Sequence, residues 1–188
     1  MDPSDPSDIA LIEAALNGDT ESFEMIIRSH SRTLFAVAYA VLQDRAEAED
    51  VVQETFVRAW NKKRWMRDPS KFPAWLTTVA RNRACDILRK RRNAEVLSGD
   101  HVDETPDTGM RRPDDLLAGE DMSAHVHTAL GSLPEQHRTA LTLRYLEGMD
   151  YLSIERTMGL TNGALRGILG RALATMRKSL KPAIEAYE

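Results

Sequence analysis

The chain has 188 residues, of which 42% are hydrophobic and 29% charged, a balance typical of a globular protein that is long enough to bury one large or two small cores. Its apolar runs are shorter than the roughly 20 residues of a membrane span, and its first eight residues, rich in Asp, Ser and Pro, do not resemble a secretory signal. The single cysteine, Cys85, allows no internal disulfide, so we expect a cytoplasmic protein, and no pattern predicts a cofactor or a metal.

The formal net charge of −4 conceals four blocks of alternating sign. Residues 1–57 carry a net charge of −9, residues 58–92 carry +10, residues 93–121 carry −7 and residues 122–188 carry +2. A block as basic as the second predicts a nucleic-acid-binding surface, although a solvated helix face would show the same excess of cations.

In the first half of the chain, apolar residues recur at steps of three and four, and glycine and proline are sparse between them. This pattern predicts a short helix over residues 8–16 and longer helices over residues 21–42, 45–61 and 73–92. Between residues 93 and 118 the periodicity is lost, and Asp, Glu, Gly, Thr and Pro predominate. That composition predicts a flexible acidic linker.

The second half is expected to be helical again, beginning with a helix over residues 114–130. Residues 132–135, Ser-Leu-Pro-Glu, have the spacing of a capping box and predict a helix that ends by Gly148. A short helix over residues 150–158, a glycine turn and a longer helix that stops at Pro182 then have the pattern of a helix-turn-helix.

These elements predict an all-α protein of two small helical domains. The first domain is expected over residues 1–93, the flexible acidic linker over 94–113, and the second domain, with the helix-turn-helix, over 114–188.

The predicted helix over residues 73–92 carries a tryptophan on its polar face. At about 100° per residue, five side chains fall within one arc: Trp75, Thr78, Asn82, Asp86 and Arg89. An aromatic ring beside Asn and Arg in the basic block can stack on unpaired bases while cations hold the phosphate backbone. Packing of Trp75 on a neighbouring helix explains the same pattern equally well.

The predicted helix over residues 45–61 has an acidic side, on which Glu47, Asp50 and Glu54 lie with Gln53 next to them. A solvated face and a docking surface for a basic partner both fit this arrangement. No nucleophile–base pair, glycine-rich phosphate loop or metal-ligand spacing accompanies these acids, so the sequence does not predict an enzyme.

Three segments of the chain resemble, in order, the extracytoplasmic-function sigma factors, which are promoter-specificity subunits of bacterial RNA polymerase. Residues 44–60, DRAEAEDVVQETFVRAW, are similar to the polymerase-binding helix of that family. Residues 72–92, FPAWLTTVARNRACDILRKRR, are similar to its promoter-melting helix, and residues 133–154 to the start of its C-terminal domain.

The resemblance implies a sigma factor that binds core RNA polymerase, directs it to specific promoters and assists promoter opening, without covalent catalysis. The implied contacts to core polymerase are Glu47, Asp50, Gln53 and Glu54. The implied contacts to the minus-ten promoter element are Lys63, Arg64, Trp65, Lys71, Trp75, Thr78, Arg81, Asn82, Asp86 and Arg89. The implied contacts to the minus-thirty-five element are Thr161, Asn162, Gly163, Arg166, Gly167 and Arg171.

The same resemblance implies an anti-sigma factor as a further partner, and it places the acidic linker in the RNA-exit path of the polymerase. A plain tether between two domains is the alternative for the linker. Two other functions fit parts of the sequence. A stand-alone helix-turn-helix regulator leaves the acidic and the basic-aromatic helices unexplained, and a nuclease lacks clustered metal-ligand carboxylates.

The last predicted helix, which corresponds to the DNA-recognition helix of the family, departs from the family pattern at its start. Where family members usually have Gly-Thr-Val-Lys-Ser-Arg-Leu, residues 163–169 are Gly-Ala-Leu-Arg-Gly-Ile-Leu, so two polar contact positions are lost. The outward face, with Gly163, Gly167 and Gly170, is expected to be nearly bare. Such a face lets either DNA or another helix approach closely, and we expect DNA.

Overall fold

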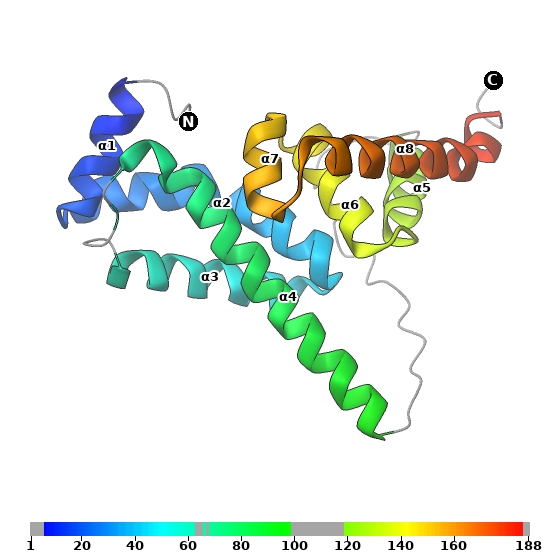
Figure 1. Cartoon of the computed structure of the whole chain (residues 1–188), viewed down its shortest axis with the longest axis horizontal. Helices are drawn as coiled ribbons and strands as arrows, with labels where there is room; N and C mark the ends of the chain where they lie inside the picture. Colours follow the sequence, from blue (N-terminus) through cyan, green and yellow to red (C-terminus); the bar gives the residue numbers. More distant parts are fainter. Residues whose placement is uncertain (1–5, 63–65, 67, 99–118, 186–188) are drawn as a thin grey trace.

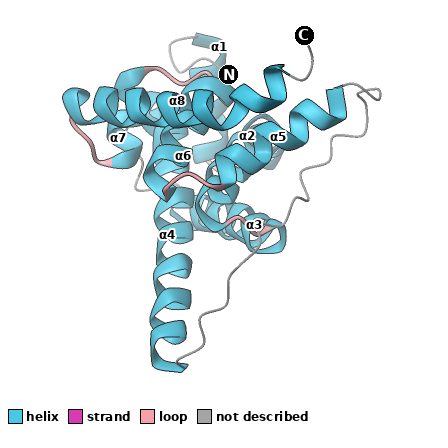
Figure 2. Cartoon of the chain, turned by 90° about the vertical axis from the view of Figure 1, so that its right-hand side faces the viewer, coloured by secondary structure: helices cyan, strands magenta, loops and turns pink. Residues whose placement is uncertain are grey.

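A computed structural model describes residues 6–62, 66, 68–98 and 119–185, and every regular element in these ranges is helical (Figures 1 and 2). The elements are α1 (Pro6–Leu16), α2 (Thr20–Leu42), α3 (Arg45–Lys62), a 3-10 turn (Pro69–Lys71), α4 (Phe72–Ser98), α5 (Gly119–Gly131), α6 (Glu135–Leu141), a π-helical segment (Thr142–Leu146), α7 (Tyr151–Met158) and α8 (Asn162–Glu185). The predicted all-α class is confirmed. Among the described helices, none combines the length and the apolar character needed to cross a bilayer.

Helix α2 begins and ends where local chemistry dictates. The Asp19 carboxylate accepts a hydrogen bond from the backbone N–H of Ser22 at 2.8 Å, which satisfies a donor that the first helical turn leaves free. At the other end Gln43 has a φ of 56°, and its N–H donates to the Tyr39 carbonyl at 2.9 Å. This left-handed residue closes the helix.

The first domain packs α1, α3 and α4 around α2. Its largest fully buried side chains include Ile12, Ile26, Leu34, Val51, Phe72 and Leu76. The ring of Phe23 lies 6.4 Å from that of Phe56 and 5.0 Å from that of Trp60, between centroids. Aromatic side chains of α3 therefore face α2, and the polar side of α3 faces outward.

The second domain packs α5, α6 and α7 against α8. Its buried core includes Leu133, Leu141, Leu143, Ile154, Leu165, Ile168, Leu169 and Ala172. In α8, Leu165, Leu169 and Ala172 are buried in this core, while Leu173 and Met176 are half-buried against it.

The two domains contact each other through α2, which packs on α6 and on the π-helical segment, and through α4, which packs on α7. Val37 is fully buried, and it packs in the core of the second domain, not of its own. The buried guanidinium of Arg138, in α6, donates to the carbonyl of Ala40 at the end of α2. The Thr33 hydroxyl donates to a carboxylate oxygen of Glu147 at 2.7 Å. The domain junction therefore combines apolar burial with polar contacts.

Helix α4 is longer than expected. It was predicted to end near Arg92 but continues to Ser98, so residues 94–98, assigned to the linker, are helical. Ala, Glu and Leu in this stretch are good helix formers, and the first breaker is Gly99. The last turns of α4 project away from the rest of the molecule in both views (Figures 1 and 2). The remainder of the predicted linker, residues 99–113, lies outside the described residues.

In the second domain, one predicted helix cap and one predicted helix end are wrong. The capping box does not form, because the Ser132 hydroxyl donates to the Ala129 carbonyl at 2.8 Å and Pro134 precedes α6 without a side-chain cap. Pro182 does not stop α8, which continues to Glu185. Its missing N–H removes a single hydrogen bond near the helix end, and the next residue, Ala183, is buried.

Candidate nucleic-acid interface

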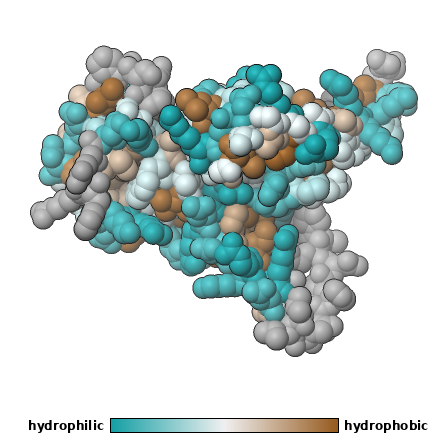
Figure 3. All heavy atoms as spheres, in the orientation of Figure 1, coloured by the Kyte–Doolittle hydropathy of each residue, from teal (hydrophilic) through white to brown (hydrophobic). Residues whose placement is uncertain are grey.

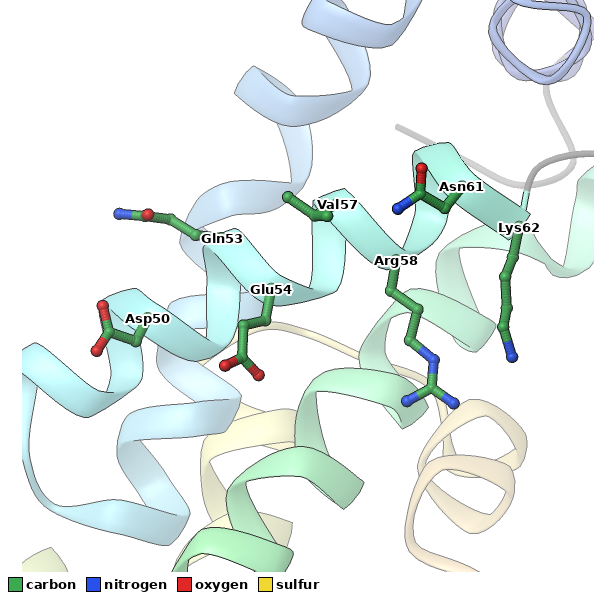
Figure 4. A pocket seen from close by; sticks show the side chains of 7 residues that line it. All are labelled: Asp50, Gln53, Glu54, Val57, Arg58, Asn61 and Lys62. Atoms are coloured by element: carbon green, nitrogen blue, oxygen red, sulfur yellow. The ribbon is translucent and has the colours of Figure 1, made fainter.

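The acidic residues of α3 divide into a paired and an unpaired part. Figure 4 shows Glu54 pointing to the side on which α4 passes, whereas Gln53 and Val57 point the other way. Arg83 of α4 donates through Nε and Nη2 to the two carboxylate oxygens of Glu54, with Nη2 to Oε1 at 3.0 Å. This bidentate pair lowers the pKa of Glu54 and raises the pKa of Arg83.

A second ion pair joins the same two helices, between Glu47 of α3 and Arg91 of α4. The four predicted polymerase contacts thus differ in environment. Asp50 and Gln53 are exposed and form no ion pair or side-chain hydrogen bond with another described residue. They border a shallow depression of about 530 Å³ on the outer side of α3, whose apolar member, Val57, is 61% exposed.

The polar face of α4 begins at Trp75, whose ring is half-buried. It stacks on the ring of Phe72 with centroids 5.9 Å apart and an interplanar angle of 25°, and it packs against the core of the first domain. The hydroxyl of Thr78 donates to the Ala74 carbonyl at 2.8 Å, one turn before Asn82, which is exposed. Trp75 therefore packs on its neighbours, as one of the two alternatives predicts, and also leaves part of its ring accessible, as the other requires.

Charged residues around this face pair locally. Asp86 and Arg89, both exposed, form an ion pair at 2.9 Å, and Lys71 pairs with Asp68 at 2.7 Å before α4 begins. In Figure 3, hydrophilic side chains cover much of the projecting half of α4. Three further predicted contacts, Lys63, Arg64 and Trp65, lie outside the described residues.

Arg81 does not lie on the exposed face with the other predicted contacts. Its side chain is 13% exposed and pairs with Glu135 of α6, Nη2 to Oε1 at 3.4 Å, across the domain junction. Its Nε is buried without a hydrogen-bond partner in the structure. In this arrangement of the domains, Arg81 is not available to DNA.

The helix-turn-helix is formed as expected by α7, a turn and α8. Asp150 caps α7 by accepting the Ser153 N–H at 2.9 Å, and this hydrogen bonding lowers the pKa of Asp150. Gly159 ends α7 with a φ of 66°, a conformation that favours glycine. The hydroxyl of Thr161 accepts from the Ala164 N–H at 3.4 Å as α8 begins.

The outward face of α8 carries glycines at the expected positions, with open space over two of them. A Cβ atom added at Gly163 or Gly170 would meet nothing within 4 Å. Gly167 differs, because the guanidinium of Arg171 lies across it, and an added Cβ would be 3.3 Å from Nη1.

Two of the predicted upstream contacts, Asn162 and Arg166, are engaged within the second domain. Arg166 donates from Nε to the side-chain oxygen of Asn162 at 2.8 Å, and the amide nitrogen of Asn162 donates to Glu155 at 2.6 Å. The guanidinium carbon of Arg166 lies 5.3 Å from the centroid of the Tyr151 ring, and that of Arg144 lies 5.2 Å from it.

Sequence reasoning missed Arg83 and Arg91 as partners of the acidic face. The spacing of these residues could have indicated the pairing. Glu47 and Glu54 are seven residues apart, and Arg83 and Arg91 are eight apart on the next long helix. When the two helices pack antiparallel, Glu54 therefore meets Arg83 and Glu47 meets Arg91. Glu155 was also missed, since nothing in its local pattern distinguishes it from a solvated acid. Among the described residues, no cluster of three potential metal ligands is present.

Comparison with known proteins covers both domains. Residues 26–94 match the family model of sigma-70 region 2, and residues 124–176 match that of sigma-70 region 4. The RNA polymerase sigma-H factor of Pseudomonas aeruginosa is 32% identical over 189 aligned positions, which span 93% of this chain and 94% of that protein. The ECF RNA polymerase sigma-E factor of Haemophilus influenzae is 28% identical and covers 94% of this chain and 96% of its own length.

Two solved structures share the fold. CnrH, in complex with the cytosolic domain of CnrY, has a TM-score of 0.68 and 27% identity, over 93% of this chain and 97% of that one. The sigma factor RpoE, in complex with the anti-sigma factor NepR from Bartonella quintana, has a TM-score of 0.71 and 25% identity, over 86% and 98%. The likeness extends over both domains.

Proposed function

The chain belongs to the extracytoplasmic-function group of the sigma-70 family, which directs RNA polymerase to promoters, and on this basis we propose which of its residues meet polymerase and DNA. The observation that carries the proposal is the separation of three exposed surfaces: the outer side of α3, the polar face of α4 and the bare face of α8. Each surface has a different chemistry, so each suits a different ligand.

The outer side of α3 is the proposed contact with core polymerase. Asp50 and Gln53 present unpaired polar groups next to the exposed side chain of Val57, a combination that suits a partner with cationic and apolar side chains. Glu54 and Glu47 lie at the edge of this surface and are already paired with α4. They contribute less to binding than Asp50, because an external cation must compete with an arginine.

The polar face of α4 is the proposed contact with the minus-ten element. The ring of Trp75, fixed by Phe72, offers a rigid surface on which an unpaired base can stack, and Asn82 lies close enough along the helix to hydrogen-bond to the same segment of DNA. Stacking recovers part of the free energy that unpairing costs. Lys63, Arg64 and Trp65 are proposed to extend this surface ahead of α4, and Lys71 to hold the backbone.

The bare face of α8 is the proposed contact with the minus-thirty-five element. Because its glycines carry no side chain that could reach a base, the backbone can approach the DNA closely, and Arg171 and Arg166 supply cations for phosphate or base edges. We expect modest base discrimination, with a share of recognition from DNA shape.

A further partner, a compartment and the path of the linker complete the proposal. The neighbours of known structure are bound to CnrY and to the anti-sigma factor NepR, and we propose that a protein of that kind restrains this chain as well. The chain is proposed to act in the cytoplasm with polymerase and to catalyse no covalent step itself. The linker is proposed to follow the RNA-exit path of the polymerase.

The domain junction must open for the proposed contacts to form together, because Arg81 is closed off by Glu135. Binding of core polymerase to the first domain supplies free energy that can separate the domains. Arg81 is then proposed to join the minus-ten surface.

Run-off transcription with purified core polymerase on a library of promoters tests the function. We expect transcription that depends on the chain and selects a subset of promoters. A stand-alone regulator would bind duplex DNA without core polymerase and give no transcript, and a nuclease would cut the templates. Either result would overturn the proposal.

A further inference from the structure

The first turn of α8 contains a chain of side-chain hydrogen bonds that starts in α7. Glu155 accepts from Nδ2 of Asn162 at 2.6 Å, and Oδ1 of Asn162 accepts from Nε of Arg166 at 2.8 Å. The chemistry fixes the orientation of the amide, because a carboxylate only accepts and a guanidinium only donates. Both polar ends of the Asn162 side chain are therefore used by the protein.

Arg166 is held by a second contact on the same side of α8. The Tyr151 ring lies 5.3 Å from its guanidinium carbon, within the range of a cation–π interaction. Its Nη1 and Nη2 donate to no other described residue, and it forms no ion pair with one. The side chain is thus restrained through Nε and the ring, while the terminal nitrogen atoms stay available for an external acceptor.

Such restraint matters for an exposed arginine. A free arginine side chain loses much rotamer entropy when it binds, and a side chain already held in its binding geometry loses less. Glu155 acts on Arg166 indirectly, through the amide of Asn162. Because the carboxylate does not pair directly with the guanidinium, the positive charge of Arg166 remains available to an anionic ligand.

We propose that Glu155 and Asn162 are positioning residues that aim the terminal guanidinium nitrogens of Arg166 at the upstream promoter DNA, and that Asn162 does not itself contact a base. This inference rests on the proposed function of α8, and it reassigns Asn162 from DNA contact to support. It also gives a role to Glu155, an acid that would otherwise be unfavourable near phosphate.

The test is a double-mutant cycle on the holoenzyme formed from the full chain and core polymerase. The probe is the promoter that is transcribed most strongly in the run-off library, with and without its upstream duplex. The variants are Glu155→Ala, Asn162→Ala and Arg166→Ala, singly and combined. We expect each of the first two to weaken upstream-dependent binding by about three- to tenfold, the cost of ordering one long side chain on binding.

Two results distinguish positioning from other roles. In the Arg166→Ala background, neither Glu155→Ala nor Asn162→Ala should weaken binding further, since the group they position is gone. Glu155→Gln should restore binding, because the amide oxygen still accepts from Asn162. Thermal unfolding and affinity for core polymerase should be unchanged in all of these variants, which separates the effect from loss of fold.

The outcomes separate the two levels of the proposal. If Arg166→Ala weakens upstream-dependent binding but the other two substitutions act independently of it, the positioning role is wrong and direct contact by Asn162 replaces it. If Arg166→Ala itself leaves upstream-dependent binding unchanged, this face of α8 does not meet DNA, and the proposed function of α8 fails together with the inference.

Discussion

Replacing Val37 by glutamate is expected to separate the two domains without unfolding either. Val37 belongs to α2 but is fully buried in the core of the second domain. Loss of its apolar burial removes about 1.5–3 kcal/mol from docking. A carboxylate enclosed there without a partner adds a penalty of several kcal/mol, which the chain escapes when the domains separate and water reaches the side chain.

Packing of α4 on α7 and of α2 on α6 opposes separation, together with three polar contacts. The hydrogen bond between Thr33 and Glu147, the ion pair of Arg81 with Glu135 and the Arg138 contact with α2 are each worth about 0.5–3 kcal/mol. A penalty of at least about 3 kcal/mol shifts the docking equilibrium more than 100-fold toward the open form. The open arrangement of the two domains is then expected to predominate over the docked one.

Small-angle scattering of the free chain measures the outcome as an increase in the radius of gyration, and circular dichroism checks that the helices persist. Val57→Glu is the matched control, because the same change is made at a valine that is 61% exposed. It should leave the radius of gyration unchanged. An unchanged radius for Val37→Glu with intact helices would refute the reasoning, as would loss of helical signal before any expansion.

Three further results are expected. Charge reversal of Asp50 together with Glu54 should weaken core polymerase binding tenfold or more in a titration, and equal affinity would remove α3 from the interface. The Glu54 change should also lower the melting temperature of the free chain, because it places a cation against Arg83, whereas reversal of Asp50 alone should leave the melting temperature unchanged. Asn82→Ala should slow open-complex formation on duplex promoters more than on templates with a pre-opened bubble, whereas Trp75→Ala should also lower the melting temperature, because its ring packs on the core. Acidification should destabilise the fold. Burial lowers the pKa of His30 below the usual value of about 6.5, so its contribution to stability is complete above pH 6.5 and is lost as pH falls from there through the lowered pKa of the folded state. A His30→Gln variant with an equal pH slope of thermal unfolding would contradict this.

The elements that the sequence predicted well are those set by local interactions. The long apolar period of α2 and the pattern of Asp150 before and Gly159 after α7 gave helices close to the observed bounds, because caps and periodicity act over a few residues. Where local signals conflicted, prediction failed. Pro182 reads as a helix stop, yet burial of Ala183 keeps α8 helical beyond it.

The site was predictable in its surfaces but not in its partners. The faces of α3, α4 and α8 follow from helical geometry alone, whereas the pairing of Glu54 with Arg83 and of Arg81 with Glu135 depends on how distant helices cross. The burial of Val37 in the other domain could not be predicted for the same reason. An apolar period marks a buried face and does not say which domain covers it.

The ion pair between Glu54 and Arg83 links the two proposed binding equilibria, that of core polymerase at α3 and that of promoter DNA at α4. If polymerase supplies a cation to Glu54, Arg83 is released from α3 and adds a positive charge to α4, the helix proposed to meet DNA. By thermodynamic reciprocity, an anion that draws Arg83 away must increase the affinity of Glu54 for the outside cation by the same factor. The displacement of Arg83 then contributes a coupling free energy to both core binding and promoter binding, so that each ligand increases the affinity of the chain for the other.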